Sequence, residues 1–302
     1  MGGTDRPRCP RTRGKHVLCE KPVCSHATEL AAVLAAAEAS GKAFMEAMRP
    51  LKSPNFNAVK ASLAELGPAR HFTGTFCQYS SRWPAYLAST ASGGEGPVPN
   101  AFLPELSNGQ LFSSISRPFY STFTRIVAPF CSTLTEFPLR LSGALMDLGC
   151  YAVYSAVSLL GPPTAVSYAP MMLPTGVDGG GTLVLKYPEA VATLVISKCS
   201  HSWNHSEIQT ENGTIRINNL GEWSEVHSQK KGGEPQPLGP GQSAALGGLD
   251  NLVFEIETFV QMVHEGKAQD DVLSWGLAMD VMNVLDNARD DAGIVYPADA
   301  TR

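Results

Sequence analysis

The chain has 302 residues, of which 43% are hydrophobic and 17% are charged, and its formal net charge is −5. This length is enough for one large domain or two modest ones. A weakly acidic chain indicates no nucleic-acid partner, and polar residues break the apolar stretches well short of the roughly 20 residues that a transmembrane helix needs. The seven cysteines are odd in number and scattered, which is typical of a reducing compartment. We therefore expect a soluble, cytoplasmic protein whose partners are neither nucleic acids nor membranes.

Residues 1–13 are basic and rich in proline, with arginines at Arg6, Arg8, Arg11 and Arg13. A basic arm or the remnant of a targeting signal is one interpretation. The segment lacks the apolar core of a signal peptide and the regular amphipathic spacing of a transit peptide. We therefore favour the other interpretation, a disordered or aberrant amino terminus.

The apolar run at residues 16–19 ends at Glu20-Lys21-Pro22 and predicts a strand that delivers one lysine to a pocket. Ser25 is placed to cap a following helix, and Gly41 lies where a left-handed residue would end it. The apolar face of that helix is formed by Leu30, Val33, Leu34 and Ala37. A short strand at 43–46 follows, so residues 14–48 predict the closing β-α-β part of a parallel sheet.

The sequence G-x-G-x-x-G occurs nowhere in the chain. Such a Gly-rich turn holds the pyrophosphate of a dinucleotide, and it normally precedes a site like Lys21 by a large part of a domain. The glycine clusters at 93–94 and 179–181 do not lead into predicted helices. We therefore expect the first half of this sheet, with its phosphate site, to be missing from the chain.

The remaining sequence predicts a mixed, largely antiparallel open sheet packed with helices. A helix at about 54–66 precedes an alternating strand at 71–77, and further strands are expected at 182–187 and 191–198. Two more strands flank Asn212-Gly213, which is a strong hairpin signal. Two amphipathic helices follow, with apolar positions at Leu252, Ile256, Phe259, Val260 and Val263, and at Leu277, Val281, Val284, Leu285 and Ala288. The predicted fold class is α/β with α+β.

A second group of polar residues, in the segment 147–151, opens an apolar helix that runs to Leu160. Asp147 and Tyr151 are four residues apart, so a helix would place both on one face. A tyrosine has an ordinary pKa of about 10, and it becomes a useful proton donor where a lysine such as Lys21 stabilises its phenolate. The spacing alone favours a simpler interpretation, with a capping aspartate, a core tyrosine and a surface lysine before a turn proline.

Several short motifs occur together in a specific order: a strand ending in Glu20-Lys21-Pro22, the helix after it, Met45-Glu46-Ala47, and the Asp-x-Gly-x-Tyr helix at 147–151. This combination resembles the glucose-fructose oxidoreductase / inositol dehydrogenase family (Gfo/Idh/MocA). Leu273-Ser274, the segment 284–286 and the ending at 293–297 are similar to its dimeric dihydrodiol dehydrogenase and NADP-dependent D-xylose dehydrogenase branch. The resemblance covers about residues 14–298.

The resemblance implies hydride transfer between NAD or NADP and a hydroxyl of a sugar or trans-dihydrodiol, with no metal. It implies that Lys21 and Tyr151 are catalytic and that Asp147 orients the tyrosine. It also implies a homodimer that forms through the C-terminal sheet. The residues implied to bind the cofactor are Glu20, Lys21, Pro22 and, at the border of the site, Arg49.

The resemblance also divides the chain into a truncated Rossmann portion at 14–48, a remnant of the NAD(P)-binding domain, and a substrate and dimerisation domain at 49–302. Residues 110–143 interrupt a stretch that runs on almost continuously in the resembling proteins. A lid or dimer-contact loop is one explanation for this insertion. We favour the other, translated non-coding sequence from an imperfect gene model.

The function expected from the family is that of an NAD(P)-dependent dehydrogenase acting on a CH–OH group. The absent Gly-rich turn favours an alternative for the chain as written, a catalytically silent binding or scaffolding fragment. A redox-neutral isomerase or lyase using the same pocket is a third possibility. The residue that distinguishes NAD from NADP would lie in the absent segment. Less specific candidates for contact with a substrate are His201, Trp203 and His205, and the pair Trp83 and Tyr86, which is equally compatible with a loop anchor.

Overall fold

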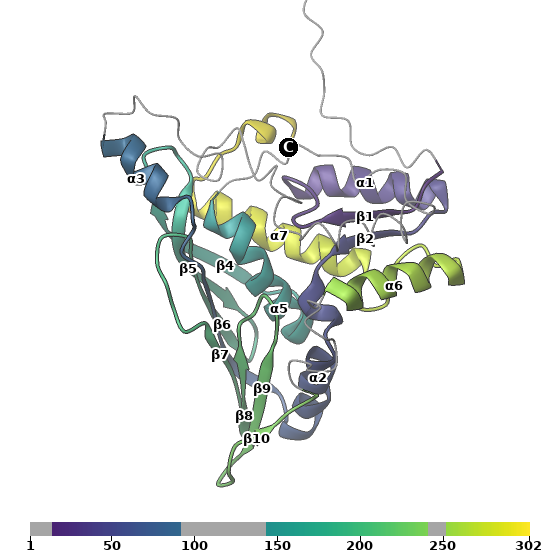
Figure 1. Ribbon diagram of the computed structural model, residues 1–302, viewed down its shortest axis with the longest axis vertical. Coiled ribbons are helices and arrows are strands. Elements are labelled where there is room, and N and C mark those ends of the chain that lie inside the picture. The colour runs from purple at the N-terminus through teal and green to yellow at the C-terminus, as the bar shows by residue number, and fades with distance from the viewer. Residues whose placement is uncertain (1–13, 92–142, 241–251) are drawn as a thin grey trace, which may run out of the picture.

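The computed structural model describes residues 14–91, 143–240 and 252–302. These residues form two sheets and the helices that cover them (Figure 1). The expectations for residues 1–13 and for the insertion at 110–143 lie outside the described residues, apart from Gly143. Among the helices of the described segments, none is long and apolar enough to cross a membrane.

The smaller sheet has two parallel strands, β1 (Val17–Glu20) and β2 (Phe44–Ala47), connected through helix α1 (Ala27–Ser40). The predicted β-α-β unit is therefore confirmed. Helix α1 ends at Gly41, whose φ of 62° is a left-handed conformation that glycine adopts without steric cost. The predicted apolar face is buried, through Leu30, Val33, Leu34 and Ala37.

The prediction of Ser25 as the cap of α1 is wrong, because His26 caps this helix. The Nδ1 atom of His26 accepts the backbone N–H of Glu29 at 3.2 Å. The Glu29 carboxylate reaches back and accepts the backbone N–H of Ser25 at 2.9 Å. Ser25 thus contributes its backbone rather than its hydroxyl, and the imidazole satisfies a free N–H of the first turn.

The larger sheet has eight strands in the order β10-β9-β8-β7-β3-β6-β5-β4. The central neighbours β3 and β6 are parallel, and the other neighbouring strands are antiparallel. The expected mixed, largely antiparallel sheet and the hairpin at Asn212-Gly213 are confirmed. In chain order the strands are β3 (Ala69–Cys77), β4 (Ala165–Met172), β5 (Asp178–Lys186), β6 (Val191–Ser197), β7 (His205–Thr210), β8 (Gly213–Asn218), β9 (Glu225–Lys230) and β10 (Gln236–Pro237).

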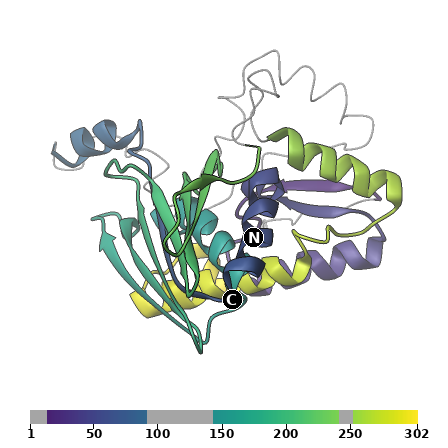
Figure 2. The ribbon, with the colours of Figure 1, turned by 90° about the horizontal axis from the view of Figure 1, so that it is seen from below.

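Helices connect the two sheets. Helix α5 (Cys150–Leu160) contacts β3 and β6, and α7 (Trp275–Ala292) contacts β4, α5 and α1. Figures 1 and 2 show α7 running from the larger sheet to α1, so this helix spans both halves of the molecule. The other elements are the 3₁₀ turns η1 (Arg49–Lys52) and η5 (Pro297–Thr301) and the helices α2 (Pro54–Leu66), α3 (Trp83–Ala91) and α6 (Leu252–Glu265).

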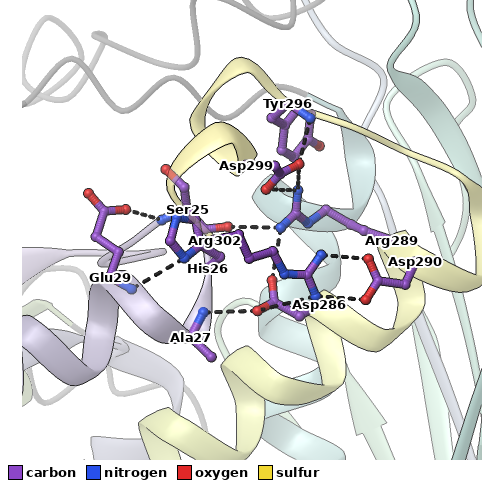
Figure 3. Close-up of polar contacts among 10 residues, drawn as sticks. All are labelled: Ser25, His26, Ala27, Glu29, Asp286, Arg289, Asp290, Tyr296, Asp299 and Arg302. Atoms are coloured by element: carbon purple, nitrogen blue, oxygen red, sulfur yellow. Dashed lines mark hydrogen bonds and ion pairs between the residues drawn. The ribbon is translucent and has the colours of Figure 1, made fainter.

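Arg289, on α7, is fully buried at the junction of α7, η5 and the start of α1 (Figure 3). Its Nη2 atom donates to the carboxylate of Asp286 at 2.8 Å and to the backbone oxygen of Ser25 at 3.2 Å. Its Nη1 atom donates to the carboxylate of Asp299 at 2.9 Å. The other oxygen of Asp286 accepts the backbone N–H of Ala27 at 2.9 Å. This cluster ties α7 to the turn between β1 and α1.

Replacing Arg289 with methionine should lower the free energy of unfolding by about 3–5 kcal/mol, because Asp286 and Asp299 would stay buried without their partner. Urea unfolding followed by circular dichroism measures this loss. Arg70→Met is the matched control, since the side chains of Arg70 and its partners Glu189 and Glu211 are 38%, 74% and 57% exposed. Exposed ion pairs contribute little to stability, so this variant should unfold almost like the wild type. Equal losses in the two variants would contradict the stabilising role of the buried arginine.

Candidate active site

Asp147 lies between two lysine side chains. The Nζ atom of Lys21 donates to Oδ1 of Asp147 at 2.8 Å and to its backbone oxygen at 2.6 Å. The Nζ atom of Lys198 lies 2.8 Å from Oδ2 of the same carboxylate. The side chains of Lys21 and Lys198 are 11% and 4% exposed, so these charges are largely withdrawn from water. Two residues that the sequence singled out, Lys21 and Asp147, are thus in direct contact.

Three separate elements bring these charges together. Lys21 directly follows β1, Lys198 directly follows β6, and Asp147 lies in a π-helical turn, η3 (Leu145–Gly149), that leads into α5. Gly149 lets this turn lie close to β6, because a Cβ atom there would come within 3.0 Å of the Cδ1 atom of Ile196. Single π turns are frequent at functional sites. The sequence predicts a regular helix here, so the wider turn is a finding of the structure.

Burial and charge pairing act in opposite directions on these groups. Burial would raise the pKa of Asp147, but Lys198 and Lys21 together hold it well below its usual range. Burial would lower the pKa of Lys21, but Asp147 and then Tyr151 raise it well above its usual value. At neutral pH Asp147 is therefore ionised and Lys21 is protonated. The Lys21 side chain is a permanent cation here and not a base.

Tyr151 lies beside this cation. The ammonium nitrogen of Lys21 is 4.5 Å from the centroid of the Tyr151 ring, which is a cation–π contact. The ring also packs edge-on against Phe76, with centroids 5.3 Å apart. Burial raises the pKa of Tyr151 to about 12, and the charge of Lys21 opposes this rise. The carboxylate of Asp147 contacts the lysines, and its negative charge also raises the pKa of Tyr151.

The other residues predicted to bind the cofactor lie around Lys21. Glu20 and Pro22 flank it, and the Lys21-Pro22 peptide bond is cis. Arg49, on η1, donates from Nε to the backbone oxygen of Gly221 at 3.2 Å. Burial raises the pKa of Glu20, and the charges of Lys21 and Arg49 oppose this rise. The charge of Arg49 also acts on Tyr151, so Arg49 lies at the edge of the same group.

Sequence reasoning missed Lys198 as a partner of Asp147. The signal was present, because the buried positions of β6 alternate through Ala192, Leu194 and Ile196. Lys198 continues this period of two beyond the end of the strand, on the face that points into the protein. A lysine at an inward position of a strand needs a buried counter-ion, and here that counter-ion is Asp147.

Glu46 and Tyr154 were also missed. Glu46 lies in β2, a strand in which every residue is buried. Its Oε2 atom accepts the hydroxyl of Tyr154, and its Oε1 atom accepts the backbone N–H of Val23 at 3.0 Å. A carboxylate within a fully buried strand could have been recognised as a buried polar contact, but its partners could not be identified from spacing.

Trp83 and Tyr86, the proposed sugar-stacking pair, stack on each other with ring centroids 4.8 Å apart. Tyr86 is buried, which favours the loop-anchor interpretation. Trp203 is 86% exposed, and its ring centroid lies 6.4 Å from that of His205. Across residues 14–91, 143–240 and 252–302, no group of three or more His, Cys, Asp or Glu side chains could hold a metal ion.

Replacing Asp147 with asparagine should lower the free energy of unfolding at neutral pH by about 3–5 kcal/mol, because two buried ammonium groups would lose their shared counter-ion. Guanidinium unfolding measures this loss. Adding Lys198→Met to the Asp147→Asn variant should restore part of the stability, since it removes one of the two facing cations. Strictly additive losses from the two substitutions would argue against the ion triad.

Several known proteins are similar to this chain over nearly all of its length. A scyllo-inositol 2-dehydrogenase (NADP(+)) of Bacillus subtilis (strain 168) is 35% identical over 287 residues, which cover 95% of this chain and 73% of the relative. A trans-1,2-dihydrobenzene-1,2-diol dehydrogenase of Bos taurus is 24% identical over 297 residues, with the same shares covered.

The fold is shared with a solved 3-ketoreductase from Actinomadura kijaniata in complex with NADP and TDP-benzene. It superposes with a TM-score of 0.65 at 18% identity, and the match covers 92% of this chain and 71% of that one. Residues 134–216 of the chain match the GFO/IDH/MocA C-terminal domain. Together with the 35% identity to the inositol dehydrogenase, this match shows that the chain belongs to the Gfo/Idh/MocA family of oxidoreductases.

Proposed function

We propose that this protein transfers hydride between NADP and a hydroxyl-bearing carbon of a polyol, sugar or diol. The observation that carries the proposal is the contact of Lys21 with both Asp147 and Tyr151, which sets a permanent cation beside a phenol. The names of the relatives support it, since one is an NADP-dependent inositol dehydrogenase and another acts on a dihydrodiol. We take scyllo-inositol as the first substrate to test, ahead of dihydrodiols and xylose.

The residues present fit the nicotinamide end of the cofactor. Glu20 is the last residue of β1, and Lys21 and Pro22 follow it, at the carboxyl edge where open α/β sheets bind their ligands. Arg49 borders this edge. The sequence holds no Gly-rich turn, so we assign no residue to the pyrophosphate. When bound, NADP supplies the hydride acceptor, and its reduced form supplies the hydride.

Lys21 and Tyr151 would manage the proton. An ammonium group has three N–H bonds, and two of those on Lys21 point at Asp147, which leaves the third for a substrate oxygen. Oxidation of an alcohol must remove the hydroxyl proton as well as the hydride, and the Tyr151 oxygen would receive that proton. In the reducing direction the phenol would return it. Because burial raises the pKa of Tyr151 to about 12, oxidation should become faster as the pH rises toward that value.

We also propose that residues 14–48 belong to the cofactor half of the molecule and residues 49–302 to the substrate half. The small sheet and α1 fall in the first range, and the larger sheet falls in the second. Within the described segments, the thiols of Cys77, Cys150 and Cys199 are free. Such thiols support a reducing compartment, and we propose the cytoplasm.

The function is tested by following NADPH formation with scyllo-inositol and NADP, and with NAD, other polyols and dihydrodiols in parallel. Lys21→Ala and Tyr151→Phe should each lower kcat/KM by about 10²–10⁴-fold, because each removes a group that handles the proton. Lys230→Ala is the matched control, since Lys230 is 75% exposed and should be silent.

Full activity in both the Lys21 and Tyr151 variants would refute the assignment. Saturable NADPH binding, followed by fluorescence, without turnover of any substrate would favour the alternative of a catalytically silent binding protein.

We propose that the chain forms a homodimer through the open face of the larger sheet. Phe72 and Ile208 are buried on the helix-covered face, so their neighbours Thr73 and Glu207 lie on the opposite one. Residues of β3, β7, β8 and β9 line a hollow of 380 Å³ on that face, which a second copy could fill: Thr73, Glu207, Arg216, His227 and Gln229 are among them.

Thr73→Glu places a second carboxylate opposite Glu207 on this face and should weaken the dimer by at least about tenfold, because two like charges would be buried side by side. Sedimentation velocity distinguishes the 32.2 kDa chain from a species of twice that mass. Glu234→Arg, at an exposed turn after β9, is the control that should not change the mass. A wild-type chain that sediments as a monomer would remove the proposal.

A further inference from the structure

Glu46 is a buried carboxylate that binds the elements carrying Lys21 and Tyr151, although the mechanism above does not use it. Glu46 is only 6% exposed to solvent. Oε1 accepts the backbone N–H of Val23 at 3.0 Å, and Oε2 accepts the hydroxyl of Tyr154. Both contacts are buried, so each replaces a hydrogen bond that water would otherwise provide.

These two contacts join the elements that carry the catalytic side chains. Val23 lies two residues after Lys21, in the turn that leaves β1. Tyr154 lies on α5, three residues after Tyr151, and therefore on a neighbouring part of the same helix surface. One carboxylate on β2 thus binds both the turn that follows Lys21 and the helix that carries Tyr151.

The Glu46 carboxyl is also titratable near neutrality. Burial raises its pKa to about 7, and hydrogen bonds from Tyr154 and Val23 and the charge of Lys21 oppose the rise. The ionisable groups that act on it are Lys21 and Glu20 from the end of β1, and Tyr154 from α5. Its charge in turn acts on Cys150, also on α5.

We propose that Glu46 is a positioning residue for the reaction, which sets the placement of Lys21 against Tyr151 and changes that placement when it gains or loses a proton. In the ionised form Oε2 accepts the Tyr154 hydroxyl. In the protonated form, Oε2 of Glu46 and the Tyr154 oxygen both carry a hydrogen atom. The Tyr154 hydroxyl then turns away, and the Glu46 hydroxyl donates to the Tyr154 oxygen, so the hydrogen bond reverses its direction. The ionised form also attracts the Lys21 ammonium, and the neutral form does not. This inference rests on the proposed function.

The first test observes Lys21 in the full chain without cofactor or substrate. The ¹⁵N resonance of its ammonium group, assigned by its loss in Lys21→Ala, should show a step near pH 7 as Glu46 titrates. Glu46→Gln keeps the acceptor for Val23 and should abolish the step. Tyr154→Phe removes a hydrogen bond that lowers the pKa of Glu46, so it should move the step to higher pH. Glu20→Gln is the matched control and should retain the step.

Persistence of the step in Glu46→Gln, or an unchanged midpoint in Tyr154→Phe, would overturn the inference. Circular dichroism confirms that each variant is folded before it is titrated, and Tyr154→Phe serves as the independent variant if Glu46→Gln does not fold.

The second test follows turnover. Glu46→Gln should lower kcat by about ten- to a hundredfold with little change in KM, because misplaced catalytic groups weaken the transition state more than substrate binding. It should also remove the limb near pH 7 from the profile of kcat. Unchanged kcat and an unchanged limb would overturn the inference even if the enzyme is active. A wild-type chain that shows the ¹⁵N step but no turnover would instead count against the proposed function.

Discussion

The Asp147 carboxylate keeps two lysine side chains together that would otherwise repel each other. Lys21 follows a strand of the small sheet, and Lys198 follows β6 of the large one. The Asp147 carboxylate therefore neutralises both lysines and links the two sheets through them. Such a buried arrangement is stable only when each charge is paired and hydrogen-bonded. Asp147 meets this condition because each of its carboxylate oxygens contacts one lysine, and its backbone oxygen accepts a further hydrogen bond from Lys21.

The Lys21 turn is held from three directions, by Asp147 at Lys21, by Glu46 at Val23 and by Arg289 at Ser25. Glu46 and Arg289 are buried, Asp147 is 22% exposed, and each of the three comes from a different element. For the proposed reaction this redundancy matters, because a displacement of a catalytic group by about 1 Å can cost a large part of the rate. The supports differ in chemistry: the Asp147 ion pair lasts across the neutral range, whereas Glu46 changes its charge within it.

Much of the fold and part of the candidate site could be predicted from the sequence. The β-α-β unit and the hairpin at 212–213 follow from local periodicity and turn chemistry, which nearby residues determine. Lys21, Asp147 and Tyr151 could be singled out because they belong to short motifs. The contact of Lys198 with Asp147 and the parallel pairing of β3 with β6 depend on tertiary packing between distant segments. The π turn at Asp147 was missed because sequence spacing cannot tell a regular turn from a widened one.

The hydrogen bond from Arg289 to the backbone of Ser25 spans 264 residues. During synthesis, β1 and α1 leave the ribosome long before α7 does. The hydrogen bond to the turn that carries Lys21 can therefore form only after most of the chain has been made. Until then the apolar face of α1 lacks α7, its contact on that side. Closing so long a loop is entropically costly and slow compared with local helix formation. The contacts of the site would therefore form late in folding, and a nascent chain would form its local helices and strands well before it could carry out the reaction.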